Sequence, residues 1–278
     1  MKTTKSKIYI DYFTYITLFI SLITGMFKSI SIIFLIIIIH ELGHIFFLKI
    51  YGYKINRIEL YPFGGITKIE KNINTPINEE ILISVGGILF QLCLAFLFLI
   101  LFDAGLVGFT TYQTFKKYNL TIMIFNALPI HPLDGSILLK CLFEKFFSYK
   151  KSFYLSAVVS ILFLGLFATY NYIFSINNYV IIAFLLFKIL TSVKDFKYLR
   201  TKFLLERYMY ELPYKSVANE KTSNIDVLKK ETLHFFQKNN RYVHERDILS
   251  KLFDKYPWFW YNQLRRLEAH SSNTALKR

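Results

Sequence analysis

Long apolar segments are the feature of this sequence that most restricts how the chain can fold. Hydrophobic residues make up 54% of its 278 residues, and they concentrate before about residue 190. A helix needs ~20 predominantly apolar residues to cross the hydrocarbon core of a bilayer. The sequence therefore predicts an α-helical polytopic membrane protein with about six transmembrane helices, over residues 8–24, 29–50, 80–102, 119–147, 153–172 and 178–193.

Basic residues are distributed unevenly over the connections between these segments. The N-terminus, the connection 51–79 and the connection around Lys150 are basic, whereas residues 171–179 contain neither Lys nor Arg. Because cytoplasmic loops collect Lys and Arg, we expect a multi-pass protein with both termini in the cytoplasm. The Lys and Arg residues of cytoplasmic loops account for much of the net charge of +15, and a basic tail suits the anionic surface of a lipid bilayer. We therefore expect no nucleic acid partner.

The connection after the second apolar segment has the pattern of a β-hairpin. Residues 54–60 alternate between apolar and polar side chains, as a strand does. Residues 61–65 include Pro62, Phe63 and two glycines, which is typical of a turn, and residues 66–69 form a second short strand. We therefore expect a membrane-associated β-hairpin with an aromatic tip.

The end of the chain is polar, which predicts a separate soluble domain. We expect a membrane domain over residues 1–193 and a cytoplasmic C-terminal domain over residues 194–278, a small soluble α/β tail. Within the tail, apolar residues at helical spacing predict one helix over 224–239 and a second over 246–253.

Two histidines four residues apart stand inside the second apolar segment. In a helix His40 and His44 share one face, so both imidazoles can reach one Zn²⁺ ion at ~2.0–2.1 Å. Glu41 lies beside them, and in His-Glu-x-x-His enzymes this carboxylate is the general base. The preceding residues 31–39 are almost all apolar, which places His40 roughly 13 Å along the helix. Ionisable groups at that depth are costly unless liganded, so zinc is favoured over a structural polar patch.

A histidine pair needs a third protein ligand to hold zinc, and a later segment offers one. Asp134 is a carboxylate in an apolar stretch that Pro129 and Pro132 interrupt. A broken helix is tolerated in a membrane where it lines a cavity. We expect Asp134 to be the third ligand, and helix capping by this residue is the alternative.

Two further polar residues accompany Asp134 in the broken segment. The amide of Asn126 suits a hydrogen bond to the substrate backbone or to a developing oxyanion, and a hydrogen bond between helices is equally open. His131 could be a spare metal ligand, a pH-sensitive neighbour of the site or an interfacial residue, and we favour the last of these roles. Together with the hairpin, which could add a strand to an unwound substrate, these residues predict zinc-assisted peptide hydrolysis.

These motifs resemble those of the site-two protease family (intramembrane zinc metalloproteases, peptidase family M50), and among them the stage IV sporulation protein FB branch. The residues that carry the resemblance lie in four places: His40-Glu41-Leu42-Gly43-His44, Asn126 with Pro129 and Pro132-Leu133-Asp134-Gly135, Pro62-Phe63-Gly64-Gly65, and Phe203-Leu204-Leu205-Glu206-Arg207-Tyr208. Carried over position by position, the resemblance implies the same zinc ligands and base, and it places Asn126, Pro129 and Phe63 near the substrate.

The resemblance also implies a biological setting. It implies one Zn²⁺ ion, and a membrane-tethered pro-sigma factor as substrate during sporulation. Inhibitory membrane proteins and a homo-oligomer are the implied partners, and the membrane around the forespore of a spore-forming bacterium is the implied location. The branch carries a cystathionine-beta-synthase-type (CBS) domain, for which the tail is short, so a degenerate CBS-like region and ATP binding there stay open.

Two other functions are compatible with the sequence. Within the same enzyme class, the chain would be a housekeeping site-two protease that acts on anti-sigma factors or signal-peptide remnants. In a different class, it would be a non-proteolytic metal transporter or metal-bound membrane scaffold. Transporters often contain repeats with broken helices in both halves, whereas one broken segment and no repeat are evident here.

Overall fold

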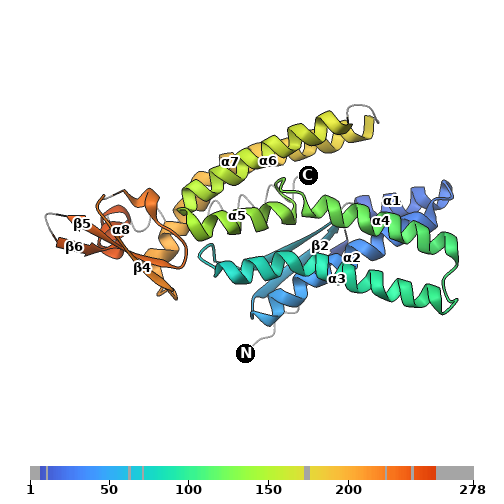
Figure 1. Ribbon diagram of the computed structural model, residues 1–278, viewed down its shortest axis with the longest axis horizontal. Helices are drawn as coiled ribbons and strands as arrows, with labels where there is room; N and C mark the ends of the chain where they lie inside the picture. The colour runs from blue at the N-terminus through green and yellow to red at the C-terminus, as the bar shows by residue number, and fades with distance from the viewer. Residues whose placement is uncertain are drawn as a thin grey trace. The chain divides into compact units, whose positions relative to one another are not determined.

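The computed structural model describes residues 7–10, 12–61, 64–70, 72–171, 176–222, 224–238 and 241–254. They form two compact units. Figure 1 shows the helices and strands coloured along the chain. The first unit comprises Met1–Lys71 and Asn78–Leu139, and the second comprises Asn72–Ile77 and Lys140–Arg278. The chain is mostly helical, with one three-stranded sheet in each unit.

The first unit contains three complete helices, α1 (Tyr12–Ile23), α2 (Phe27–Ile50) and α4 (Phe109–Ala127). It also contains all but the first residue of α3 (Ile77–Asp103) and the beginning of α5 (Asp134–Phe146). Buried apolar side chains of α2, α3 and α4 form its core: Ile32, Ile36, Leu94 and Phe115. The rings of Phe98 and Phe115 stack with 3.7 Å between their centroids, which joins α3 to α4. This packing holds the middle of α2 against its neighbours.

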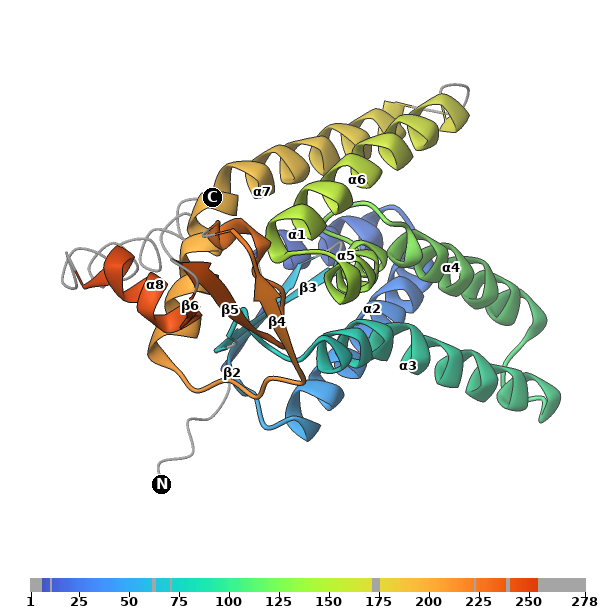
Figure 2. The same cartoon turned by 60° about the vertical axis from the view of Figure 1, so that its left-hand side comes forward.

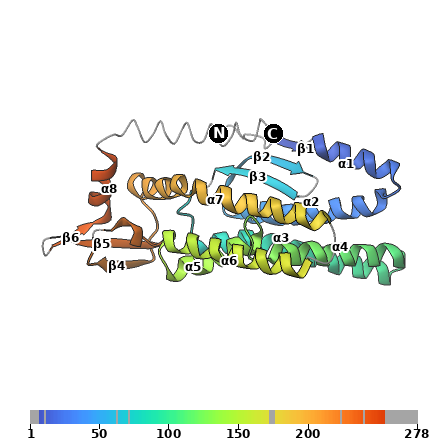
Figure 3. The same ribbon diagram turned by 90° about the horizontal axis from the view of Figure 1, so that it is seen from above.

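The sheet of the first unit confirms the predicted hairpin and adds a strand to it. Strands β2 (Lys54–Tyr61) and β3 (Gly64–Glu70) pair antiparallel and run beside α2 (Figure 3). The tip residues Pro62 and Phe63 lie outside the described residues. Strand β1 (Lys7–Ile10) pairs in parallel with β2, so the segment expected to span from residue 8 begins as a strand. Its alternating Ile and Tyr side chains suit a strand, and the edge of β2 supplies hydrogen bonds.

Three helices among the described residues are long and apolar enough to cross a membrane: Phe27–Ile50, Ile77–Asp103 and Tyr149–Thr169. The predicted break in the fourth segment is confirmed, because residues 128–133 separate α4 from α5. The sixth predicted segment lies within α7 (Ile176–Met209), and α1 is only 12 residues long. The count of six spans stays a prediction.

The second unit is built from a helix pair and a small mixed sheet. Its elements are the end of α5, α6 (Tyr149–Asn171), α7, β4 (Ser216–Glu220), the 3-10 turn η1 (Ile225–Val227), β5 (Thr232–Lys238), β6 (Arg241–His244) and α8 (Glu245–Phe253). Figure 2 shows β4, β5 and β6 side by side with α8 next to them. Aromatic residues dominate the core that joins α6 and α7 to this sheet: Tyr149, Phe153, Phe196, Phe203 and Phe236.

One predicted helix of the tail is wrong and the other is confirmed. The described part of the segment predicted over 224–239, residues 224–238, forms η1 and β5 instead of a helix, whereas α8 covers the second prediction. Glu231 has a positive φ of 55°, a left-handed conformation that a right-handed helix cannot contain. Leu228 and Phe236 both enter the core, as helical spacing suggested, but they come from separate elements. Pairing of β5 with β4 and β6 supplies the backbone hydrogen bonds that a helix would have made.

A buried ion pair ties the end of α7 to the tail. The guanidinium of Arg207 donates to both carboxylate oxygens of Glu245, at 3.1 and 2.7 Å, and both side chains are almost fully buried. The guanidinium also donates to the backbone oxygens of Lys229 and Thr232. The neighbouring Glu206 accepts hydrogen bonds from residues 73 and 74 of the same unit. In the motif of residues 203–208, Arg207 thus anchors the tail, and Glu206 anchors the loop before α3.

Replacement of Glu245 by Gln is expected to destabilise the tail by about 3–5 kcal/mol, because it leaves the buried charge of Arg207 uncompensated. The expected readout is faster hydrogen exchange of the β5 amides in the full-length protein. Lys215→Gln is the matched control, since it breaks an exposed ion pair with Glu231 that contributes at most about 1 kcal/mol. Equal exchange in both variants would contradict the prediction.

Acid should weaken the same ion pair. Burial alone would raise the pKa of Glu245, but hydrogen bonds and charge from His234, Arg207 and Tyr214 lower it from the ordinary 4.5 to about 2. A carboxyl group with a lowered pKa stabilises the fold fully above its unfolded value. The contribution is therefore complete above pH 4.5 and is lost as the pH falls toward 2. The Gln variant should lack this part of the acid dependence.

Candidate metal centre

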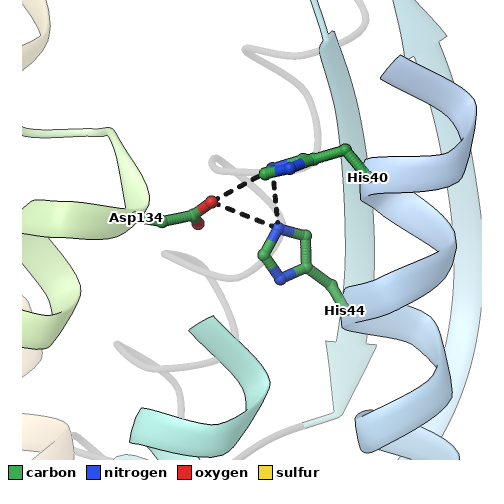
Figure 4. Close-up of side chains that lie close together, drawn as sticks. All are labelled: His40, His44 and Asp134. Carbon is green, nitrogen blue, oxygen red and sulfur yellow. Dashed lines mark hydrogen bonds and ion pairs between the residues drawn. The ribbon is translucent and has the colours of Figure 1, made fainter. Parts of the chain in front are cut away.

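The three predicted ligands come together in the first unit. His40 and His44 project from one face of α2, and Asp134 is the first residue of α5, immediately after the Pro-containing bend. Figure 4 shows the two imidazole rings and the carboxylate pointing toward one another. The Oδ2 atom of Asp134 lies 3.1 Å from Nε2 of His40 and 3.3 Å from Nε2 of His44, and the two Nε2 atoms are 3.1 Å apart.

The other ring nitrogen of each histidine has an acceptor of its own. His40 Nδ1 lies 3.1 Å from Oε1 of Gln91, and His44 Nδ1 lies 2.7 Å from the backbone oxygen of Ile83. Acceptors at Nδ1 favour a proton there, which leaves both Nε2 lone pairs directed into the site. Three electron-rich atoms then face one another, and Asp134 Oδ2 has no hydrogen-bond donor among the described residues. Such an arrangement needs a cation at its centre.

The spacing of these atoms fits zinc. In a tetrahedral site with metal–ligand distances of ~2.0–2.1 Å, neighbouring ligand atoms are about 3.3–3.4 Å apart. The observed separations of 3.1–3.3 Å are close to that value. Two neutral imidazoles and one carboxylate also form a donor set that zinc enzymes use, with a fourth position for water. The residues present therefore fit a single Zn²⁺ ion.

Glycines on α2 and α3 make room for this arrangement. A Cβ atom on Gly43 would lie 2.2 Å from the backbone oxygen of Gly86, so the two helices cross in direct backbone contact there. A Cβ atom on Gly87 would lie 2.4 Å from Cε1 of His40 and 2.7 Å from Nε2 of His44. Gly87 thus provides the space that both imidazole rings occupy.

Another glycine positions the carboxylate. A Cβ atom on Gly135 would lie 2.1 Å from the backbone oxygen of Ala127, so the first turn of α5 packs directly against the last turn of α4. The hydroxyl of Ser136 donates to the oxygen of Leu133 at 2.8 Å and helps start α5. The bend at residues 128–133 therefore returns the chain tightly and brings Asp134 to its place beside α2.

The other residues predicted for the site are not among the three whose ligand atoms converge. Glu41 is half-buried on α2, and its charge is near enough to His44 to interact with it. Asn126 is half-buried in the last turn of α4, and Pro129 is half-buried in the bend. His131 lies in the same bend and is not one of the three described residues whose ligand atoms converge. Phe63 lies outside the described residues.

Gln91, the partner of His40, was not among the residues predicted from the sequence. This side chain is fully buried in α3, within one of the three candidate membrane helices. A polar amide in the middle of an apolar segment was the available signal, since buried polar groups in a membrane need a partner. The paired glycines before it were also visible, but only the contact with the histidine rings shows what Gly87 does.

Comparisons with known proteins place the chain among zinc metalloproteases. The sequence profile of peptidase family M50 matches residues 28–117, which include both histidines. Stage IV sporulation protein FB of Bacillus subtilis is 34% identical over 205 residues, 73% of this chain and 71% of that protein. A zinc metalloprotease of Methanocaldococcus jannaschii is 33% identical over 124 residues, 44% of this chain and 36% of that protein.

The fold also has a counterpart among solved structures. The site-2 protease from Methanocaldococcus jannaschii matches with a TM-score of 0.53 and 22% sequence identity. The match covers 69% of this chain and 93% of that chain. At this level of identity the likeness shows a shared fold, that of a membrane protein.

Proposed function

Because this chain belongs to peptidase family M50, the site-2 protease family, we propose that His40, His44 and Asp134 bind its Zn²⁺ ion and that Glu41 is its catalytic base. The chain is an integral membrane zinc metalloprotease. The convergence of two Nε2 atoms and one carboxylate oxygen within 3.1–3.3 Å is the observation that carries the assignment.

The residues of the site have complementary tasks in peptide hydrolysis. Zinc would supply Lewis-acid activation of water and of the scissile carbonyl. The carboxylate of Glu41 takes a proton from the attacking water and delivers it to the nitrogen of the leaving amine. The amide of Asn126 donates to the substrate backbone or to the developing oxyanion, and Pro129 and Phe63 are the further residues proposed to contact the substrate.

The hairpin supports handling of an extended substrate. A helical substrate must unwind locally before its peptide bond reaches the zinc, and its freed backbone groups then need partners. Strand β3 pairs with β2 alone among the described strands, so its other edge suits strand addition. Main-chain hydrogen bonds to β3 would hold the unwound segment beside α2.

The substrate that we propose is a membrane-tethered pro-sigma factor, processed at the membrane around the forespore. Similarity to stage IV sporulation protein FB over 73% of the chain supports this choice over anti-sigma factors or signal-peptide remnants. The proposal includes six spans, both termini in the cytoplasm, inhibitory membrane proteins and a homo-oligomer. It also includes a membrane domain over residues 1–193 and a cytoplasmic domain over 194–278. ATP binding by the tail stays open.

The test is co-expression of the full chain with membrane-tethered candidate substrates. A pro-sigma factor is expected to yield a shorter product that depends on Glu41, whereas a tethered anti-sigma factor and a signal-peptide remnant should stay intact. Cleavage of either alternative in place of the pro-sigma factor would support a housekeeping protease. Absence of any Glu41-dependent product from all three would contradict the proposed function.

A further inference from the structure

The side-chain amide of Gln91 contacts a histidine of the metal centre, although the proposed reaction gives it no chemical role. It lies in α3, 51 positions along the chain from His40, and none of its surface is exposed. An amide buried in an apolar helix is costly to desolvate unless it makes a hydrogen bond. Its Oε1 atom makes that bond with Nδ1 of His40 at 3.1 Å.

This contact controls which nitrogen of His40 carries the proton. An acceptor at Nδ1 keeps the proton there, and Nε2 then presents its lone pair beside Asp134 and His44. The bond also fixes the rotation of the imidazole ring. His44 obtains the same control from the backbone oxygen of Ile83, which no side-chain substitution removes. Among the described residues, the acceptor at Nδ1 is therefore a side chain for His40 and a backbone oxygen for His44.

The helix that carries Gln91 is itself held in register. The amide of Asn119 on α4 donates to the backbone oxygen of Gln91 at 3.4 Å, in a buried position. This bond joins α3 to α4 without touching either histidine. Asn119 thus offers a way to loosen the same region while leaving the acceptor of His40 in place.

We propose that Gln91 is the positioning residue of the metal centre, which holds His40 in the tautomer and orientation that direct Nε2 at zinc. The inference rests on the proposed zinc site. Removal of a residue that hydrogen-bonds to a metal ligand typically weakens metal binding by about 10–100-fold. The opposite orientation of the amide makes the opposite prediction, because an N–H group facing Nδ1 would force the proton onto Nε2 and hinder metal binding.

The experiment is a zinc titration of the full-length protein in detergent, by competition with a chelating dye. Gln91→Leu removes the acceptor at similar size and should weaken zinc binding by about 10–100-fold. Gln91→Glu keeps an acceptor oxygen and should restore affinity to near the wild-type value. Asn119→Leu should leave affinity within a few-fold of wild type. The visible spectrum of the Co²⁺-loaded protein should change in the Leu variant and not in the Asn119 variant.

Three results would overturn the proposal. They are unchanged or tighter zinc binding by Gln91→Leu, equal losses in the Gln91 and Asn119 variants, and no rescue by Gln91→Glu. Gln91→Met supplies the same comparison with an unbranched side chain if the Leu variant does not fold. Cleavage by the wild type is measured alongside, so loss of the proposed protease function is seen separately from a failure of Gln91 to affect zinc binding.

Discussion

Replacement of Glu41 by Gln is expected to abolish cleavage while zinc stays bound. The substitution keeps the size of the side chain and its position on α2, but an amide cannot accept the proton of the attacking water. General acid–base catalysis by one side chain typically contributes about 10²–10⁴-fold to the rate, so a loss of at least this size is expected. The measurement pairs the rate of cleavage of a membrane-tethered substrate with the zinc content of the purified protein.

Glu79, a carboxylate outside the metal centre, provides the matched control. It is half-buried in the first turn of α3, where it accepts a hydrogen bond from the hydroxyl of Tyr53 at 2.6 Å. Glu79→Gln makes the same chemical change outside the metal centre and should leave both the rate and the zinc content unchanged. Retained cleavage by Glu41→Gln would remove Glu41 from the mechanism. Joint loss of zinc and cleavage would instead point to a structural role.

Replacement of Gly87 by Ala is expected to prevent normal zinc binding. The added methyl group would approach His40 Cε1 to 2.4 Å, His40 Nδ1 to 2.6 Å and His44 Nε2 to 2.7 Å. These atoms belong to both ligand rings, so neither ring can keep its place unless α2 and α3 separate. The helices have little freedom to do so, because Gly43 and Gly86 are already in backbone contact. We expect zinc affinity to fall by at least about 100-fold, which is more than the usual effect of losing a hydrogen bond to a metal ligand.

The control for this substitution is Gly165→Ala in α6. A Cβ atom there meets nothing within 4 Å, so the change should leave zinc binding unaltered and slightly favour the helix. Far-UV circular dichroism of both variants checks that the helices are retained. Wild-type zinc affinity in a folded Gly87→Ala protein would show that the two imidazole rings do not occupy the positions found here.

Much of the arrangement of the candidate site was predictable because it depends on local geometry. Four residues make about one turn of a helix, so the spacing of His40 and His44 already places both rings on one face. The break before Asp134 follows from two prolines, which cannot continue a helix without losing hydrogen bonds. The hairpin follows from the alternation of residues 54–60 and from the Pro and Gly residues that come next. These inferences need only residues that are neighbours along the chain.

The tail shows where local patterns were insufficient. Ile225, Leu228, Leu233 and Phe236 have a spacing that suits a helix, yet residues 232–238 form the middle strand of a sheet. Short apolar runs are ambiguous between the two structures, and partners elsewhere in the chain decide between them. Here β4 and β6 offered hydrogen bonds, and Arg207 fixed the connection before β5 by bonding to the backbone oxygens of Lys229 and Thr232.

By itself, the sequence predicted the proposed zinc ligands and the proposed base, and it determined the broken segment that carries Asp134. Only the tertiary structure decided that Nε2 of each histidine faces Asp134. It also decided that oxygen atoms of Gln91 and Ile83 lie at the two Nδ1 atoms, and that Gly87 leaves room for the rings. The physical reason is that ring rotation and tautomer depend on atoms from other helices. Those contacts join residues 39 or more positions apart, and no periodicity along the chain encodes them.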